Sequence, residues 1–175
     1  MLSVIFVDIP TRKPNRLKDF DYSQNGAYFV TICTKDKHKL LCNIVGDGVL
    51  DVPSVRLTSF GKIADNQIQT MNSIYSHINV DKYIIMPNHI HMLLSIQCGN
   101  DYYKGTSRTP SPTNNIVSQF VSTFKRFCNK QYGQNIWHRS YHDHIIRNDH
   151  DYLDRWNYIE NNPLKWNSDR FYTEN

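Results

Sequence analysis

The chain has 175 residues, of which 39% are hydrophobic and 13% aromatic. This length fits a single domain over residues 1–175 with a core of its own, and the composition excludes an intrinsically disordered protein. The net charge of +4 and the pI near 8.8 permit a polyanionic partner such as a nucleic acid. Many proteins without such a partner have a similar charge, so this observation alone does not assign one.

The cysteines and the N-terminus indicate the compartment. Four cysteines are widely spaced without a CxxC pair, which is typical of ordinary thiols in a reducing compartment. The apolar run in MLSVIFVDIP has no basic residues before it, and Asp8 interrupts it. No stretch approaches the roughly 18 apolar residues of a membrane span. We therefore expect a cytoplasmic protein with no membrane partner.

The first part of the chain predicts an arm, a strand and a helix. Residues 1–22 are polar and charged, with two prolines, and predict an N-terminal arm. β-Branched and aromatic residues over 26–36 predict a strand, whereas glycines and a proline over 42–56 indicate a loop or a hairpin. Apolar residues recur at roughly helical spacing over 58–74, which predicts a helix.

Two strands and a long loop follow. The apolar segments 78–86 and 89–96 predict short strands joined across Pro87 and Asn88. Residues 98–115 are rich in glycine, serine, threonine and proline, which is typical of a surface loop.

The last part of the chain predicts helix, strand and helix. The first of these helices has an apolar face formed by Ile116, Phe120, Phe124 and Phe127. Residues 136–147 predict a strand, and the last helix extends from about His150 until Pro163 ends it. The element order is therefore β-α-β-β-α-β-α. This order predicts an α+β, ferredoxin-like sandwich: a four-stranded antiparallel sheet with helices on one side, plus a C-terminal helix.

A histidine pair interrupts one apolar strand, in MPNHIHMLLSI. Residues two apart on a strand point the same way, so His89 and His91 share one face while their neighbours pack on the other. A short HxH motif is more often two strand histidines without a ligand than a metal site. As ligands, imidazoles suit zinc, manganese, iron and copper, whereas magnesium prefers oxygen. Leu93 excludes a histidine triad, and Leu93 with Leu94 excludes an HxHxDH zinc hydrolase.

The last helix supplies a partner for the histidines. Projected at about 100° per residue, its predicted core stripe is formed by Tyr152, Leu153, Trp156 and Ile159. Tyr158 falls opposite that stripe, and Asn162 follows one turn later on the same side. Pro163 biases the backbone of Asn162 away from the helix. A tyrosine beside a divalent ion can attack a phosphodiester and keep the bond energy as a tyrosyl phosphodiester.

The segments PNHIHMLL, WHRSYHDHIIRN and YIENNPLKW together resemble the single-tyrosine HUH transposases, in particular their REP-associated branch. DYSQNGAYFVTICT is similar to the first strand of that family, and the similarity covers most of residues 20–166. The resemblance implies a ferredoxin-like fold that binds single-stranded DNA, often beside a hairpin, as a monomer or a homodimer. It also implies Mg²⁺ or Mn²⁺ as the cofactor, and cleavage that leaves a 5′-phosphotyrosine and a free 3′-OH.

The resemblance also assigns roles to individual residues. His89 and His91 match the metal-binding histidines, Tyr158 matches the nucleophile, and Asn162 matches the position of a third metal ligand. Candidate DNA-binding residues are Lys125, Arg126, Arg139, His144 and Arg147. For the His142 and His144 pair, a phosphate contact or a structural hydrogen bond is favoured over a second metal site.

Two other functions are compatible with the same sequence. A non-catalytic single-stranded nucleic-acid-binding protein of ferredoxin-like fold would use aromatic residues of the first strand, such as Tyr28 and Phe29, although no RNP1 pattern is present. A metallohydrolase of small phosphodiesters would need the histidines but not the tyrosine.

Overall fold

The computed structural model describes residues 24–46, 53–97 and 116–173. The predicted arm over 1–22 and the predicted surface loop over 98–115 lie outside the described residues. Within the described part of the chain, no helix is long and apolar enough to cross a membrane.

A four-stranded antiparallel sheet forms the centre of the molecule. Its strands are β1 (Gly26–Cys33), β4 (Ile78–Met86), β5 (His89–Ile96) and β6 (His142–Ile145). They lie in the order β4-β5-β1-β6, so β1 and β5 are the two central strands of this sheet. Every neighbouring pair is antiparallel, which is the topology of the predicted ferredoxin-like sandwich.

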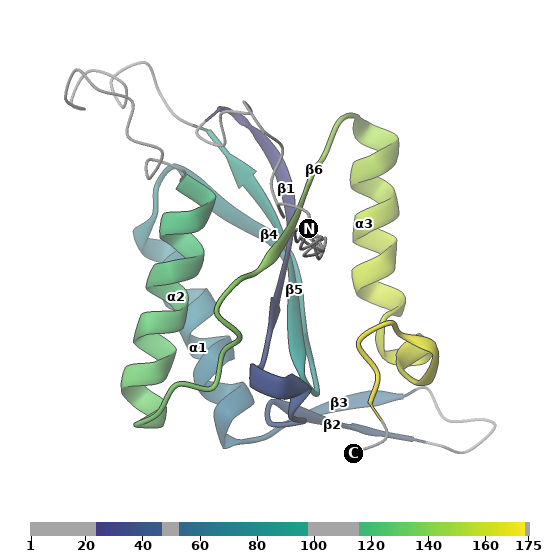
Figure 1. Ribbon diagram of the computed structural model, residues 1–175. Coiled ribbons are helices and arrows are strands. Elements are labelled where there is room, and N and C mark those ends of the chain that lie inside the picture. The colour runs from purple at the N-terminus through teal and green to yellow at the C-terminus, as the bar shows by residue number, and fades with distance from the viewer. Residues whose placement is uncertain (1–23, 47–52, 98–115, 174–175) are drawn as a thin grey trace, which may run out of the picture.

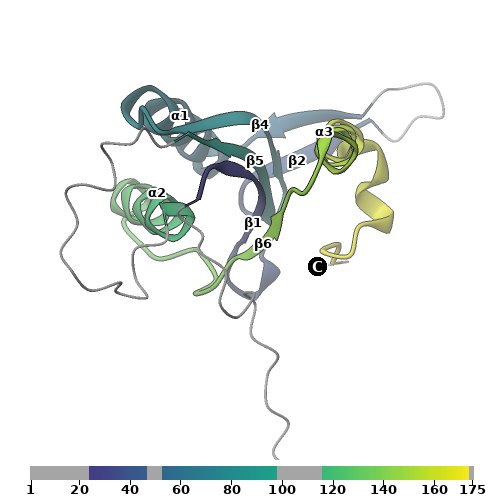
Figure 2. The same ribbon diagram turned by 90° about the horizontal axis from the view of Figure 1, so that it is seen from above.

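The helices cover the two faces of this sheet unequally. Helices α1 (Ser59–Ile74) and α2 (Ile116–Tyr132) pack on one face. Helix α3 (Asp149–Asn161) lies alone on the opposite face, as the two perpendicular views show (Figures 1 and 2). The predicted fold class, with an additional C-terminal helix, is confirmed.

Alternation along β5 separates the two faces. Ile90, Met92 and Leu94 are buried in the large apolar core beneath α1 and α2. Leu93 belongs to a small apolar cluster beneath α3, and His89 and His91 share its face of the strand. The predicted division of this strand into a packing face and a histidine face is confirmed.

The segment that the sequence left open as loop or hairpin is a hairpin. Its strands β2 (Cys42–Val45) and β3 (Ser54–Leu57) form a separate two-stranded sheet at one end of the molecule (Figure 1). After α3, a 3₁₀ helix (Pro163–Ser168) folds back below it. The chain therefore returns toward the sheet after Pro163.

Two predicted strands are shorter in the structure. The strand predicted over 26–36 ends at Cys33, and a short 3₁₀ turn follows. The strand predicted over 136–147 forms regular pairing only at His142–Ile145. Before it, Trp137 makes an isolated bridge to Thr34, so the segment is extended there without being part of a ladder.

The predicted apolar faces of two helices need correction. Phe127 is 39% exposed at the edge of α2, and Cys128 is buried in its place. On α3, Leu153 is 57% exposed and does not belong to the core stripe. Including Leu153 in the predicted core stripe shifted the expected buried side of the helix away from Tyr158. Without it, the buried side turns toward Tyr158, which packs against the small cluster of Phe29, Leu93 and Ile159.

Candidate active site

His89 is held in one tautomer by its neighbour Asn88. The Asn88 side-chain amide donates to the carbonyl oxygens of Phe171, at 2.8 Å, and Lys37, at 3.3 Å. Its Oδ1 therefore faces His89 Nδ1, at 2.9 Å, and can only accept. His89 must carry its proton on Nδ1, which leaves Nε2 as a free electron-pair donor.

His91 is oriented in the same way by a strand neighbour. Its Nδ1 lies 2.8 Å from the Oγ1 of buried Thr31, which pairs with it across β1 and β5. The Nε2 atoms of His89 and His91 face each other at 3.0 Å. Hydrogen bonding of the far ring nitrogen is the usual support of a metal-bound histidine, so both imidazoles are set to bind one ion.

Burial keeps both imidazoles neutral. Each side chain is fully buried. Burial lowers the pKa of His89 from 6.5 to about 4, although the nearby Asp169 carboxylate opposes this change. Burial also lowers the pKa of His91 well below its ordinary value, and the charges of neighbouring residues add to the effect. Neutral imidazole is the form that binds metal, so these pKa values favour ligation at neutral pH.

Tyr158 lies beside the histidines and is bonded to an acid. Its ring meets the His91 ring at a centroid distance of 5.2 Å. Its hydroxyl donates to Oδ2 of Asp169, at 3.0 Å. Burial, followed by the charge of Asp169, raises the pKa of Tyr158 above its ordinary value. The phenol is therefore protonated in this structure, with an acceptor in place for its proton.

Asn162 stands one turn after Tyr158, as predicted. Its backbone keeps helical angles, with φ −61° and ψ −41°, despite the following Pro163. Its Nδ2 donates to Asp169 Oδ2 at 3.1 Å, which fixes the orientation of the amide. Its Oδ1 is buried without a hydrogen-bond partner among the described residues. A buried, unpaired acceptor is costly unless a ligand satisfies it.

These groups fit a divalent cation. Ligand atoms of His89, His91 and Asp169 all lie within 4.8 Å of one another. Asn162 joins this group through the bond from its Nδ2 to Asp169, and its carbonyl oxygen is unpaired among the described residues. Two imidazoles with carboxylate and amide oxygens form a mixed nitrogen and oxygen set, which suits manganese and accepts magnesium.

Aromatic side chains enclose the histidines. Phe171 and Trp166 lie against His89, with ring centroids 4.6 Å and 6.0 Å away. Phe29 stacks on His91 at 5.0 Å. A pocket of about 430 Å³ opens beside His91 and Tyr158 and gives access to the site.

The predicted DNA-binding residues of α2 and the segment after it are scattered. Lys125 Nζ donates to the carbonyl oxygens of His138 and Ser140, at 2.9 and 3.0 Å, and burial lowers the pKa of Lys125 to about 8. Lys125 thereby holds the extended segment before β6 against the helix. Arg126 and Arg139 are exposed. The structure does not bring these residues together with the histidine site.

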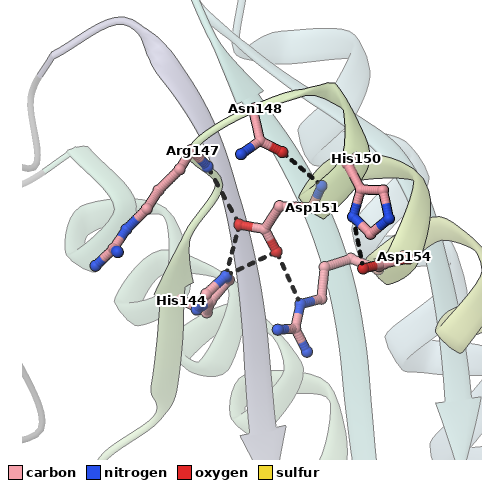
Figure 3. Close-up of polar contacts among 7 residues, drawn as sticks. His144, Arg147, Asn148, His150, Asp151 and Asp154 are labelled. Atoms are coloured by element: carbon pink, nitrogen blue, oxygen red, sulfur yellow. Dashed lines mark hydrogen bonds and ion pairs between the residues drawn. The ribbon is translucent and has the colours of Figure 1, made fainter.

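His144 and Arg147 lie nearer the site, at the junction of β6 and α3. His144 Nε2 contacts both carboxylate oxygens of Asp151, at 3.0 and 2.8 Å, and the Arg147 backbone N–H also bonds to Asp151 (Figure 3). The sequence favours a phosphate contact or a structural hydrogen bond for His144, and in the structure His144 makes a hydrogen bond to Asp151. Among the described residues, the group of His, Cys, Asp or Glu side chains that could hold a metal ion is His89, His91 and Asp169, and it includes neither His142 nor His144.

Sequence reasoning missed several residues of the site. Asp169 lies beyond the recognised YIENNPLKW block, and a fold-back after Pro163 brings it to Tyr158. Thr31 and Asn88 lie inside the recognised segments DYSQNGAYFVTICT and PNHIHMLL, but neither was assigned a role. The signal for Thr31 is its position on β1 directly opposite His91, which only the strand register shows.

Comparisons with known proteins find relatives of this chain in sequence and in fold. No protein-family model matches the chain. A Haemophilus influenzae protein named "Uncharacterized protein" is 28% identical over 175 residues, covering 93% of this chain and 94% of that protein. A second H. influenzae protein, named "Putative REP-associated tyrosine transposase", is 25% identical over 153 residues, covering 83% of this chain and 74% of that protein.

A solved structure shares the fold. It is the structure of a REP-associated tyrosine transposase bound to a REP hairpin, with a TM-score of 0.60 and 19% identity, covering 86% of this chain and 73% of that one. The resemblance to REP-associated tyrosine transposases that the motifs indicated is confirmed by these comparisons.

Proposed function

We propose that this chain, related in sequence and fold to REP-associated tyrosine transposases, is a metal-dependent single-stranded DNA endonuclease and strand transferase. Tyr158 is the nucleophile. His89, His91 and Asn162 hold Mg²⁺ or Mn²⁺, with Asp169 beside them. The substrate is single-stranded DNA next to a hairpin, as the hairpin bound by the related transposase suggests.

One observation supports this proposal above the others. The Tyr158 hydroxyl donates to Asp169 at 3.0 Å, and the same carboxylate lies within 4.8 Å of the ligand atoms of two neutral histidines. A phenol needs both a proton acceptor and an activated phosphorus before it can attack. The cluster supplies the acceptor, and its ligand set supplies the place for the activating ion.

The protein residues account for the other requirements of the reaction. When bound, a divalent ion polarises phosphorus and stabilises the charge on the phosphate oxygens. His89 and His91 stay neutral and fixed by Asn88 and Thr31. The aromatic wall formed by Phe171 and Trp166 limits access of water to His89.

The reaction exchanges one phosphodiester for another. The Tyr158 oxygen forms a bond to phosphorus while the bond from phosphorus to the 3′ oxygen breaks. The phenolic proton passes to Asp169, and the departing 3′ oxygen takes up a proton to give the 3′-OH. The 5′ phosphate remains on Tyr158, and attack by another 3′-OH reverses these steps and transfers the strand.

The test is adduct formation by the full chain with hairpin-bearing single strands and Mn²⁺. We expect a covalent protein–DNA species whose modified peptide, identified by mass spectrometry, contains Tyr158. Tyr158→Phe should abolish this species and leave DNA binding in gel shifts unchanged. Tyr152→Phe is the matched control, because Tyr152 lies on the same helix and its hydroxyl bonds to Asp81 instead. Adduct formation by Tyr158→Phe at the wild-type rate would refute the assignment.

The burial of the first strand argues against the non-catalytic alternative. Tyr28 and Phe29 are 1% and 6% exposed, so neither ring is available for base stacking. Helix α3 covers the sheet face that such a binder would use (Figure 2). A hydrolase of small phosphodiesters would keep its activity in Tyr158→Phe, so the same variant tests that function with a chromogenic substrate.

A further inference from the structure

The pocket beside Tyr158 is lined by the positively charged side chain of Arg155, which has no role in the reaction described above. Arg155 lies on α3 three residues before Tyr158, and both side chains line the 430 Å³ pocket together with His91. Residues three apart on an α-helix lie on the same side of it. The guanidinium and the nucleophile therefore enter the same space from one helix.

An aromatic ring supports the guanidinium. Arg155 Cζ lies 5.5 Å from the centre of the Phe29 ring. The same ring stacks on His91, at 5.0 Å and 27° between planes, and meets Tyr158 edge-on at 5.9 Å. Arginine on an aromatic face keeps its N–H edges available for a planar or tetrahedral anion. The Phe29 ring therefore contacts Arg155, His91 and Tyr158, and these three side chains lie around it.

A carboxylate forms an ion pair with one edge of the guanidinium, without a hydrogen bond at Nε among the described residues. Asp151 Oδ1 lies 3.4 Å from Arg155 Nε, and Asp151 is itself held by His144 and by the Arg147 backbone N–H (Figure 3). Asn148 caps the helix by accepting from the Asp151 backbone N–H at 2.9 Å. A contact at Nε leaves the Nη groups, with four N–H donors, to meet a ligand.

The scissile phosphate gains negative charge during the reaction, and a cation near it stabilises that charge. The divalent ion, when bound, would offset part of the charge of Asp169 and the phosphodiester, and a guanidinium would add to that effect. Arg155 and Arg170 both line the pocket.

On the basis of the proposed function, we propose that Arg155 donates from its Nη groups to a non-bridging oxygen of the scissile phosphate. Asp151 and His144 act as positioning residues that fix the guanidinium. The contact stabilises the charge that develops as the Tyr158 oxygen bonds to phosphorus. Because every DNA sequence has this phosphate, the contact supports cleavage without reading a base.

The test compares ordinary DNA with DNA whose scissile phosphate carries a methyl group in place of one non-bridging oxygen. The full chain, Mn²⁺ and hairpin-bearing strands are used, with the two methylphosphonate diastereomers separated. Arg155→Met should slow adduct formation about a hundredfold on ordinary DNA. On one diastereomer the same variant should be slowed less than about threefold, because the oxygen that Arg155 contacts is absent.

Further variants separate a phosphate contact from a structural role. Arg155→Lys should recover part of the rate, because it restores charge without the planar fork. Asp151→Asn should have the same kind of effect as Arg155→Met: it should slow adduct formation more on ordinary DNA than on the sensitive methylphosphonate diastereomer. Arg56→Met, at an exposed position on β3, should react like the wild type on both substrates.

Two results would overturn the assignment of Arg155. One is an equal loss in Arg155→Met on ordinary DNA and on both diastereomers. The other is that Arg155→Met still slows adduct formation when the methyl group is on the scissile phosphate, and no longer does so when the methyl group is on a flanking phosphate. Failure of the proposed function has a different signature: wild-type protein would form no adduct that depends on Tyr158, and both proposals would then fall.

Discussion

The two faces of the central sheet contrast in what they bury. Beneath α1 and α2 lies a large, nearly all-apolar core, whereas the buried apolar residues of the small cluster beneath α3 are, within the described ranges, Phe29, Leu93 and Ile159. The α3 face instead carries buried histidines and the hydroxyl of Tyr158. Adjacent residues His91 and Met92 therefore belong to different regions of the molecule. One face stabilises the fold, and the other holds polar groups in place for chemistry.

The largest effect is expected from the histidine face. His91→Ala should abolish the Mn²⁺-dependent adduct and the rise in thermal unfolding midpoint that Mn²⁺ gives to the wild type, because a ligand that binds only the folded state stabilises it. Thermal unfolding with and without Mn²⁺ measures this. Met92→Leu is the neighbouring control, since a volume-conserving change should keep the Mn²⁺ response. A full Mn²⁺ response in His91→Ala would contradict the assignment of the ligand.

Truncation on the packed face should reduce stability instead. Phe124 is fully buried in the core beneath α2, so Phe124→Ala should lower the free energy of unfolding by about 3–5 kcal/mol. Trp156→Ala on α3 should cost less, because Trp156 is only half-buried. Urea denaturation of both variants provides the comparison. Equal losses would show that the two faces contribute alike to the fold.

Removal of the proton acceptor should slow the reaction without affecting the fold. Asp169→Asn cannot take the Tyr158 proton, so we expect the single-turnover rate of adduct formation to fall about a hundredfold. Asp154→Asn is the matched control, because Asp154 is an exposed aspartate on the helix that carries Tyr158 and pairs with His150. An unchanged rate in Asp169→Asn would assign the acceptor to solvent.

The buried histidines should make stability depend on pH. The pKa of His89 is lowered from 6.5 to about 4 by burial, so below pH 6.5 the unfolded chain binds protons that the folded chain does not. The stability is therefore full above pH 6.5 and falls as the pH decreases toward 4. Urea midpoints measured with a chelator between pH 7.5 and 4.5 test this. The double variant His89→Gln, His91→Gln should show a shallower fall, and an identical slope would contradict the linkage.

The smallest effect is expected at the rim of α3. Lys82 pairs with Glu160 at 3.0 Å, but Glu160 is 62% exposed. Exposed pairs contribute little, so Glu160→Gln should change the free energy of unfolding by less than about 1 kcal/mol. Lys82 also lies 4.3 Å above the Trp156 ring, a contact that the variant keeps. A larger loss in urea denaturation would show that this ion pair secures α3 to β4.

The sequence was sufficient where a periodic pattern repeats. The two-residue alternation of β5 assigned His89 and His91 to one face and their neighbours to the other, and the structure agrees. The order of elements likewise led to the observed sheet. Both follow from local geometry, which a single chain displays without knowledge of its neighbours.

The sequence was insufficient where contacts depend on tertiary placement. Leu153 is apolar and at the right spacing, yet α3 has only a narrow contact with the sheet and leaves it exposed. Asp169 has no periodic or motif signal, because it reaches Tyr158 only through the turn after Pro163. The link of Asp151 to both His144 and Arg155 depends on how β6 meets α3, which no pattern encodes.

The late position of Asp169 in the chain has a consequence for synthesis. All four strands of the sheet and both helices of the packed face precede it, and domains generally fold as units while the ribosome is still working. A nascent chain can therefore possess a folded sheet and paired histidines before Tyr158 meets Asp169. Translation itself delays assembly of the candidate site until the sheet and its packed face have been made.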